Sequence, residues 1–268
     1  MSHHPNKTVI KKPSWLKVKA PTGDNLHDLK DILRKRKLVT VCEEARCPHM
    51  GECWNGGTAT FMVLGDTCTR GCRFCAVKTS RVGQAVDIFE PKKIADAVAE
   101  MQLEYVVLTA VDRDDVDDQG ASHFANTIAA IRRAHPKVLI ETLIGDYRGD
   151  LEPLEILIKA KPEVLAHNVE TARRLSSKVR DPRAKYDQSL MQLERVKQID
   201  PEIYSKSAIM VGLGETFDEV VETMRDLRAV QCDVLTIGQY LQPTTKHLRV
   251  ENFVHPQTFK EFEKIGKE

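Results

Sequence analysis

The stretch TFMVLGDTCTRGCRFC, residues 60–75, joins an apolar run to three closely spaced cysteines. Residues 60–66 read as a buried strand, and Cys68, Cys72 and Cys75 follow it as C-x3-C-x2-C. A loop that carries three thiols is therefore expected directly after the first strand. Beyond it, short apolar runs alternate with longer amphipathic segments, which is the pattern of repeated strand and helix units around a parallel sheet.

Six strands and five intervening helices are expected after residue 59. The strands are predicted at 60–66, 105–111, 137–144, 164–170, 207–213 and 233–240, and the helices at 92–102, 121–134, 151–160, 186–199 and 215–230. Parallel strands need helical crossovers of one hand, so these units can curl into an open barrel with its site at the carboxyl ends of the strands. The expected fold class is α/β, a partial (β/α)6 barrel preceded by an N-terminal extension.

Three parts of the chain are distinguished by these elements. Residues 1–59 form the extension, with a helix around Asp24 to Arg36 and a cysteine-bearing loop, and residues 60–245 form the barrel. Residues 246–268 form a C-terminal segment that ends in FKEFEKIGKE, a charged helical stretch without a stop signal. This ending predicts that the C-terminal segment is truncated.

Composition narrows the classes of protein to consider. A chain of 268 residues with 41% hydrophobic content can bury a large core. It has no run of 18 apolar residues and no apolar signal-peptide core, so a cytoplasmic protein without a membrane segment is expected. Residues 1–37 hold ten Lys or Arg against three Asp, which indicates a solvated basic arm or a docking surface for an acidic partner. No aromatic platform or nucleic-acid motif accompanies them, so no nucleic-acid partner is expected.

The cysteines favour metal chemistry over disulfides. Six of the seven lie between residues 42 and 75, and Cys232 is expected to be a buried apolar residue. Three thiolates can hold three corners of a four-iron, four-sulfur cube and leave its fourth iron free to bind a group other than protein. The alternatives are a zinc site and a packing role for the cysteines. A closed zinc site is less suited to this spacing, because it usually takes four protein ligands as two separated pairs.

Two cysteine triplets carry a family resemblance. The C-x3-C-x2-C loop after the first strand of a six-unit barrel resembles the radical SAM superfamily. A second triplet, Cys42, Cys47 and Cys53, lies ahead of that strand as C-x4-C-x5-C. Together with the segments VDRDD, GASHFA, HNVET, YDQSL, KSAIMVGLGET and IGQYLQPT, the two triplets make nearly the entire chain similar to the lipoyl synthase family.

The resemblance implies a reaction and two 4Fe-4S clusters. The open iron of one cluster would bind S-adenosylmethionine (SAM), and reductive cleavage would yield a 5′-deoxyadenosyl radical that abstracts hydrogen. Sulfur would enter at C6 and C8 of an octanoyl chain attached to a lipoyl carrier domain. By match of motif, Cys68, Cys72 and Cys75 hold the SAM-binding cluster, and Cys42, Cys47 and Cys53 hold the auxiliary cluster that is consumed as the sulfur donor.

The implied partners follow from the same reaction. The resemblance implies octanoylated carrier domains, namely the glycine cleavage H protein and the E2 domains of 2-oxoacid dehydrogenases. It also implies a reducing electron donor such as flavodoxin or ferredoxin. The enzyme is expected to act as a monomer.

Polar residues near the carboxyl ends of the predicted strands are candidates for SAM contacts. They are Thr109, Asp112, Asn168, Glu170, Arg180 and Gln242. A carboxylate such as Glu170 can accept two hydrogen bonds from ribose hydroxyls, and the guanidinium of Arg180 can pair with a carboxylate. Each of these side chains could instead be a satisfied loop residue or a helix cap.

One departure from the family keeps alternatives open. The family ends with an Arg-Ser-Ser-Tyr type segment whose serine binds the auxiliary cluster, whereas the last serine here is Ser207. The alternatives are a radical SAM sulfurtransferase that acts on another substrate and a turnover-deficient homologue without that serine ligand. A non-enzymatic carrier of electrons is a further alternative, although the size of the barrel argues against it.

Overall fold

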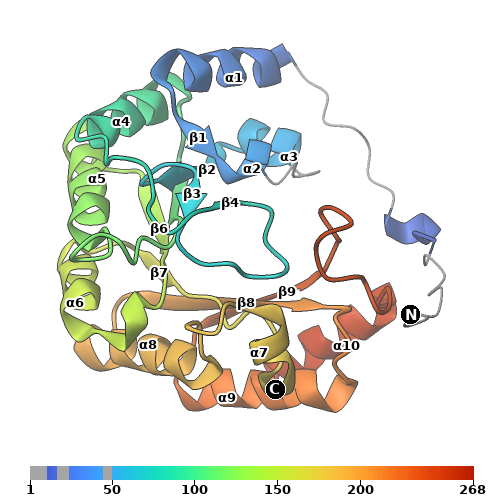
Figure 1. Ribbon diagram of the computed structural model, residues 1–268. Coiled ribbons are helices and arrows are strands. Elements are labelled where there is room, and N and C mark those ends of the chain that lie inside the picture. The colour runs from blue at the N-terminus through green and yellow to red at the C-terminus, as the bar shows by residue number, and fades with distance from the viewer. Residues whose placement is uncertain (1–10, 17–23, 45–49) are drawn as a thin grey trace.

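Seven strands form one curved sheet in the part of the chain that the computed structural model describes, residues 11–16, 24–44 and 50–268 (Figure 1). The order is β1-β2-β5-β6-β7-β8-β9, with β1 antiparallel to β2 and every other pair parallel. A separate parallel pair joins β3 to β4. The strands are β1 (Val39–Thr40), β2 (Thr58–Val63), β3 (Thr67–Cys68), β4 (Lys78–Thr79), β5 (Tyr105–Ala110), β6 (Leu139–Leu143), β7 (Val164–Ala166), β8 (Tyr204–Val211) and β9 (Val234–Gln239).

Helices cover the outer face of the curved sheet, and α1 to α3 lie at the end of the molecule near β1 (Figure 1). The α-helices are α1 (Asp24–Arg36), α2 (Val41–Glu44), α3 (Met50–Asn55), α4 (Glu90–Glu100), α5 (Ala121–Ala134), α6 (Leu151–Lys159), α7 (Ser176–Val179), α8 (Tyr186–Ile199), α9 (Phe217–Ala229) and α10 (Pro256–Lys267). Short 3-10 turns are η1 (Ser14–Leu16), η2 (Tyr147–Gly149) and η3 (Arg173–Leu175).

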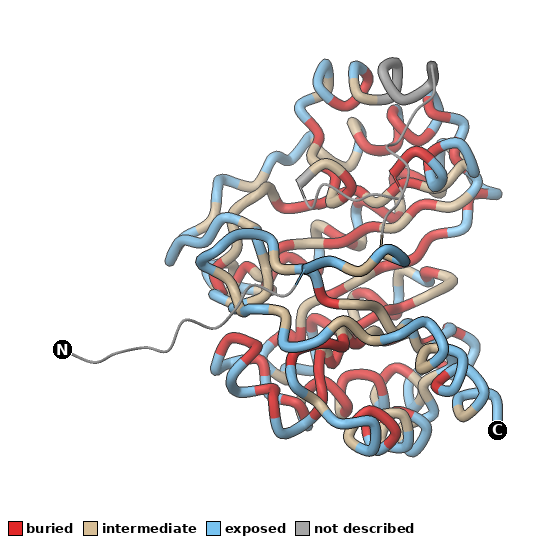
Figure 2. Tube along the Cα trace, turned by 90° about the vertical axis from the view of Figure 1, so that its right-hand side faces the viewer, coloured by how far each residue is buried: buried red, intermediate tan, exposed pale blue. Residues whose placement is uncertain are grey.

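The burial of these segments explains why the sequence pattern predicts them as strands and helices. Parallel strands covered by helices are rich in apolar residues, as in β5, where Val106 and Leu108 on one face are fully buried and Val107 on the other face is half-buried. The helices bury one stripe, as α5 does with Phe124, Ile128 and Ile131. Figure 2 shows the result, with buried stretches along the strands and exposed stretches on the outside. The predicted α/β fold with a mostly parallel sheet is thereby confirmed.

The N-terminal extension packs against the barrel. Leu33 of α1 and Trp54 of α3 are buried in the same apolar cluster as Phe61 of β2. The strand β1 pairs with β2, which brings the following helix α2 close to the end of the first barrel strand. This packing places Val41, the first residue of α2, beside the first barrel strand.

The C-terminal end of the strand predicted at 164–170 is the least accurate of the predicted boundaries. The strand β7 ends at Ala166, and the backbone reaches a left-handed conformation at Glu170, where φ is 68°. Glu170 returns to the sheet through one isolated parallel bridge to Ile209. The sequence pattern also missed β1, the β3–β4 pair and α7, which are too short to show a hydrophobic period.

Candidate active site

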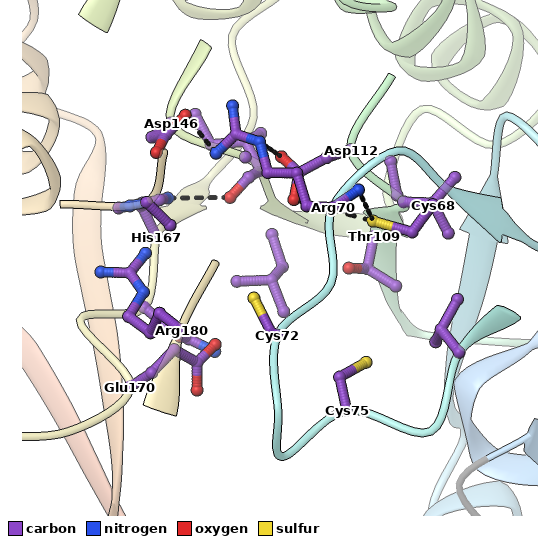
Figure 3. Close-up of a pocket in the computed structure, with 18 of the residues that line it drawn as sticks. Cys68, Arg70, Cys72, Cys75, Thr109, Asp112, Asp146, His167, Glu170 and Arg180 are labelled. Carbon is purple, nitrogen blue, oxygen red and sulfur yellow. Dashed lines mark hydrogen bonds and ion pairs between the residues drawn. The ribbon is translucent and has the colours of Figure 1, made fainter. Parts of the chain in front are cut away.

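A cavity of about 310 Å³ lies at the carboxyl ends of the strands, beside the loop that carries three cysteines (Figure 3). Polar and thiol side chains from distant parts of the sequence meet on its wall. Those predicted for the site and found there are Cys68, Cys72, Cys75, Thr109, Asp112, Asn168, Glu170 and Arg180. They converge because parallel strands present their carboxyl ends at one edge of the sheet.

The cysteine loop, residues 68–77, is held at both ends. The pairing of β3 with β4 closes its base. On its far side the Arg73 N–H donates to the Val179 carbonyl at 2.9 Å, and the Gly71 N–H donates to the Asp181 carboxylate at 2.9 Å. These bonds fix the position of the loop relative to the segment that follows α7.

Backbone N–H groups point at two of the sulfur atoms. Arg70 N lies 3.4 Å from Cys68 Sγ, and Asp181 N lies 3.3 Å from Cys72 Sγ. Burial raises the pKa of Cys68 to about 11 and that of Cys72 to about 12, and it also raises the pKa of Cys75. Thiols in such surroundings form thiolates when a metal binds, and amide donors to sulfur are typical of iron-sulfur sites. The residues of this loop therefore fit an iron-sulfur cluster.

The spacing of the ligands separates a cube from a single ion. Among the described residues, no three His, Cys, Asp or Glu side chains are gathered closely enough to hold one metal ion. The ligands of a zinc ion must converge on one point, whereas the three thiolates of a cube each bind a different iron. The three cysteines of the loop 68–77 thus favour the cube.

Arg70 anchors the cysteine loop to the ends of two strands. Its buried guanidinium bonds to the Asp114 carboxylate at 2.9 and 3.0 Å, and it lies 2.7 Å from Asp146 and 3.7 Å from Asp112 (Figure 3). Burial alone would lower the pKa of Arg70, but these three carboxylates outweigh it and raise the pKa. Burial also raises the pKa of Asp112 to about 6, against the charge of Arg70.

The wall opposite the cysteine loop carries Glu170 and Arg180, which lie next to each other below His167 in Figure 3. The left-handed backbone at Glu170 is uncommon for a residue with a side chain, and such strain is concentrated at functional sites. Burial raises the pKa of Glu170, while the positive charge of Arg180 and a hydrogen bond from Asn168 oppose the change. The wall therefore presents a carboxyl group and a guanidinium side by side to whatever occupies the cavity.

Gln242 lies apart from this group. Its Nε2 donates to the His247 carbonyl at 3.0 Å, and it is not among the described residues that line the cavity. The same segment reaches the cysteine loop differently, because the His247 ring donates from Nε2 to the Cys75 carbonyl at 2.9 Å. Leu248 N–H adds a bond of 3.1 Å to the Arg73 carbonyl. The segment after β9 thus supports the loop through groups that the sequence did not mark.

The other cysteine triplet is described in part. Cys42 is buried in α2 and follows Val41, which lines the cavity, whereas Cys53 is exposed in α3. Cys47 lies outside the described residues. Of the described cysteines of this triplet, Cys42 is therefore the one next in sequence to a residue of the cavity wall.

Three polar residues of the cavity were missed or undervalued by the sequence reasoning. Asp146 follows β6, so the rule that selected Thr109 and Asp112 after β5 would also have found it. Arg70 lies between two ligands of the loop, but its partners are distant in sequence. His167 was not marked as a site residue, yet it lines the cavity.

Two family models match the sequence. The radical SAM superfamily matches residues 62–227, and the N-terminal domain of lipoyl synthase matches residues 2–47. The mitochondrial lipoyl synthase of Rattus norvegicus is 53% identical over 264 residues, which are 97% of this chain and 71% of the relative. The lipoyl synthase of Thermus thermophilus is 53% identical over 257 residues, 96% of this chain and 80% of the relative.

Solved structures show the same fold at low sequence identity. Methylornithine synthase has a TM-score of 0.61 at 14% identity, over 93% of this chain and 74% of its own. The FeFe-hydrogenase maturase HydG from Carboxydothermus hydrogenoformans has a TM-score of 0.59 at 16% identity, over 90% of this chain and 62% of its own. At these identities the similarity concerns the fold alone.

Proposed function

This chain belongs to the lipoyl synthase family of radical SAM enzymes, and from that premise we propose how its residues serve the reaction. It is a sulfurtransferase that inserts sulfur at C6 and C8 of a protein-bound octanoyl group to make the lipoyl group. Its cofactors are SAM and two 4Fe-4S clusters. No side-chain acid or base breaks an unactivated C–H bond, so the reaction needs a radical that abstracts hydrogen. The cofactors supply this radical and the sulfur.

We assign the SAM-binding cluster to Cys68, Cys72 and Cys75. The observation that carries the assignment is the shared cavity, whose wall holds these three thiols on one side and polar groups on the other. The loop would contribute three ligands, which would leave the fourth iron of a cube free to bind SAM. The chain's own part is to hold the thiolates in place and to keep bulk water from the reacting atoms.

Contacts to SAM are proposed for six side chains around this corner: Thr109, Asp112, Asn168, Glu170, Arg180 and Gln242. The first five are supported by their position on the cavity wall. Gln242 remains a prediction that rests on the sequence, since its amide is directed at the His247 carbonyl. Arg180 suits the carboxylate of SAM, and Glu170 suits its ribose hydroxyls.

The auxiliary cluster is assigned to Cys42, Cys47 and Cys53. The position of Val41 on the cavity wall, next to buried Cys42, supports this assignment. An octanoyl chain in the cavity would then lie near both iron-sulfur sites. We keep residues 1–59 as the extension with this cluster, residues 60–245 as the barrel and residues 246–268 as a C-terminal segment.

The substrate is carried by a lipoyl carrier protein. We propose the glycine cleavage H protein and the E2 domains of 2-oxoacid dehydrogenases as carriers, and flavodoxin or ferredoxin as the electron donor. A cytoplasmic monomer is proposed as the working form. None of the helices in the described part of the chain is both long and apolar enough to cross a membrane.

The proposed roles can be tested with an octanoylated H protein. The anaerobically reconstituted enzyme is treated with a reductant in the presence of SAM and the carrier. The mass of the carrier is then measured by mass spectrometry. The chain should be used as it stands and with an added C-terminal Arg-Ser-Ser-Tyr segment, because the family uses that serine as a cluster ligand. Gain of two sulfur atoms by the carrier is expected, and a carrier unchanged by both forms would refute the assignment of carrier.

A further inference from the structure

We propose that Ser189 and His167 are positioning residues that hold the guanidinium of Arg180 toward the cavity. None of the three is near another in the sequence, yet their side chains form one continuous chain of hydrogen bonds. The proposal rests on the proposed function, because it takes Arg180 as a contact of SAM. It adds two residues that would act through Arg180 without touching SAM themselves.

The chain of hydrogen bonds runs from the cavity wall into the core. Arg180 Nη1 donates to Ser189 Oγ at 2.8 Å, and Ser189 Oγ lies 2.9 Å from His167 Nε2. The other ring nitrogen of His167 lies 2.9 Å from the Ile144 carbonyl. Ser189, on α8, is 0% exposed, so these partners and the Lys185 carbonyl at 3.2 Å stand in place of water.

The direction of each bond follows from the inventory of donors. The Ile144 carbonyl can only accept, so Nδ1 of His167 carries the proton. The neutral ring then accepts at Nε2, and the Ser189 hydroxyl is its donor. The oxygen of Ser189 keeps a lone pair for the Arg180 N–H, and a hydroxyl that donates is also a stronger acceptor. Because the Ser189 hydroxyl has a single proton, the Lys185 carbonyl then accepts from the Ser189 N–H at 3.1 Å instead.

A neutral His167 is what its surroundings favour. Burial and then the positive charge of Arg180 lower the pKa of His167 to about 4, against the opposing effects of the Ile144 carbonyl and Asp146. Arg70 is the second cation that acts on the ring. A protonated ring would turn Nε2 into a second donor toward Ser189 and would repel Arg180.

The backbone of Arg180 is fixed independently of this chain. Its N–H donates to the Ser176 carbonyl at 2.8 Å, and the next residue, Asp181, bonds to Cys72 Sγ through its own N–H. Beyond Nη1, the guanidinium retains donor capacity. Its Nε is buried, and in the described part of the chain it has no hydrogen-bond partner. A carboxylate in the cavity would supply the partner that Nε lacks.

The contribution of Ser189 is therefore orientation. An arginine side chain has many rotamers, and a ligand must otherwise hold one of them at a cost in entropy. Ser189 selects one rotamer before the ligand arrives, and His167 orients the Ser189 hydroxyl. Loss of a hydrogen bond to a charged group commonly weakens binding about tenfold or more.

The test compares SAM dissociation constants of reconstituted variants by equilibrium dialysis. Ser189→Ala and His167→Leu should each bind SAM about tenfold more weakly. His167→Gln retains an acceptor for the Ser189 hydroxyl and should stay within about threefold of the unmodified enzyme. Ser205→Ala is the matched control, since Ser205 is also buried and hydrogen-bonded but lies at the amino end of β8. It should leave the dissociation constant unchanged.

A second readout does not depend on binding or turnover. Nitrogen-15 NMR of the imidazole rings should show His167 with a proton on Nδ1 and a bare Nε2 from pH 6 to 8. A proton on Nε2 of His167 would overturn the proposal even if a serine variant failed to fold.

Unchanged SAM affinity in Ser189→Ala and His167→Leu, with weakened affinity in Arg180→Gln, would refute the positioning role and leave the SAM contact standing. Unchanged affinity in Arg180→Gln would refute that contact itself and the positioning role with it.

Discussion

Arg70 Nη1 and Asp146 Oδ1 lie 2.7 Å apart, and the side chains of both residues are at most 2% exposed. This ion pair connects the loop with three thiols to the residue that follows β6. Asp114 adds two further bonds to the same guanidinium. Because removal of one partner leaves buried charges uncompensated, the pair makes the loop sensitive to a single substitution.

Arg70→Gln is expected to lower the free energy of unfolding by about 3–5 kcal/mol and to reduce iron content. The carboxylates that Arg70 now neutralises would stay buried without a cation. Arg173→Gln is the matched control, because Arg173 also bonds two aspartates but its side chain is 46% exposed, and it should lose about 1 kcal/mol or less. Denaturant unfolding measures both, and equal losses would contradict the role of Arg70.

Gly212→Ala is expected to destabilise the protein by at least about 2 kcal/mol. Gly212 has φ of +100°, and an added Cβ would come within 2.2 Å of Gln239 Nε2 and 2.6 Å of the Asn252 carbonyl. At Gly238 an added Cβ would meet nothing within 4 Å, so Gly238→Ala serves as the control and should change little. Thermal unfolding compares the two, and a Gly212→Ala protein as stable as the control would contradict this description of the turn.

The contribution of His167 to the free energy of unfolding is expected to fall as the pH is lowered from 7 to 5. The pKa of His167 is about 4 in the folded protein, against about 6.5 in the unfolded chain, so the unfolded state binds more protons in this window. The stabilisation is complete above the unfolded pKa, and about 2 kcal/mol of it is lost by pH 5.

His167→Gln isolates this contribution, because glutamine does not titrate. The difference in unfolding free energy between the two proteins should change by about 2 kcal/mol from pH 7 to 5, with iron content checked at each pH. A difference that stays constant over this range would show that His167 is not buried in its neutral form.

Hydrophobic runs revealed most of the barrel, because its parallel strands are short apolar runs that alternate with amphipathic helices. The run from Tyr105 to Ala110 and the helix Ala121–Ala134 were predicted nearly or fully as the structure has them. Val39–Thr40 and Ser176–Val179 were missed, since such short segments are stabilised by their tertiary neighbours and leave no periodic pattern.

The candidate site was predictable where position along a strand decides it. Thr109, Asp112, Asn168 and Glu170 follow or end β5 and β7, so topology alone brings them to one cavity. Contacts between loops are different, because they depend on side-chain directions that no local pattern encodes. The amide of Gln242 is directed at the His247 carbonyl, and the guanidinium of Arg70 reaches acids from two strand ends.

We propose, as the central point, that the two cysteine triplets have different functions and that SAM binds at the loop of Cys68, Cys72 and Cys75. The most direct measurement is the amount of 5′-deoxyadenosine that forms when reconstituted variants are treated with a reductant in the presence of SAM. Cys72→Ala should form none, whereas Cys42→Ala should still cleave SAM but add no sulfur to an octanoylated carrier. Cleavage of SAM by Cys72→Ala, or its loss in Cys42→Ala with the remaining cluster intact, would contradict the claim.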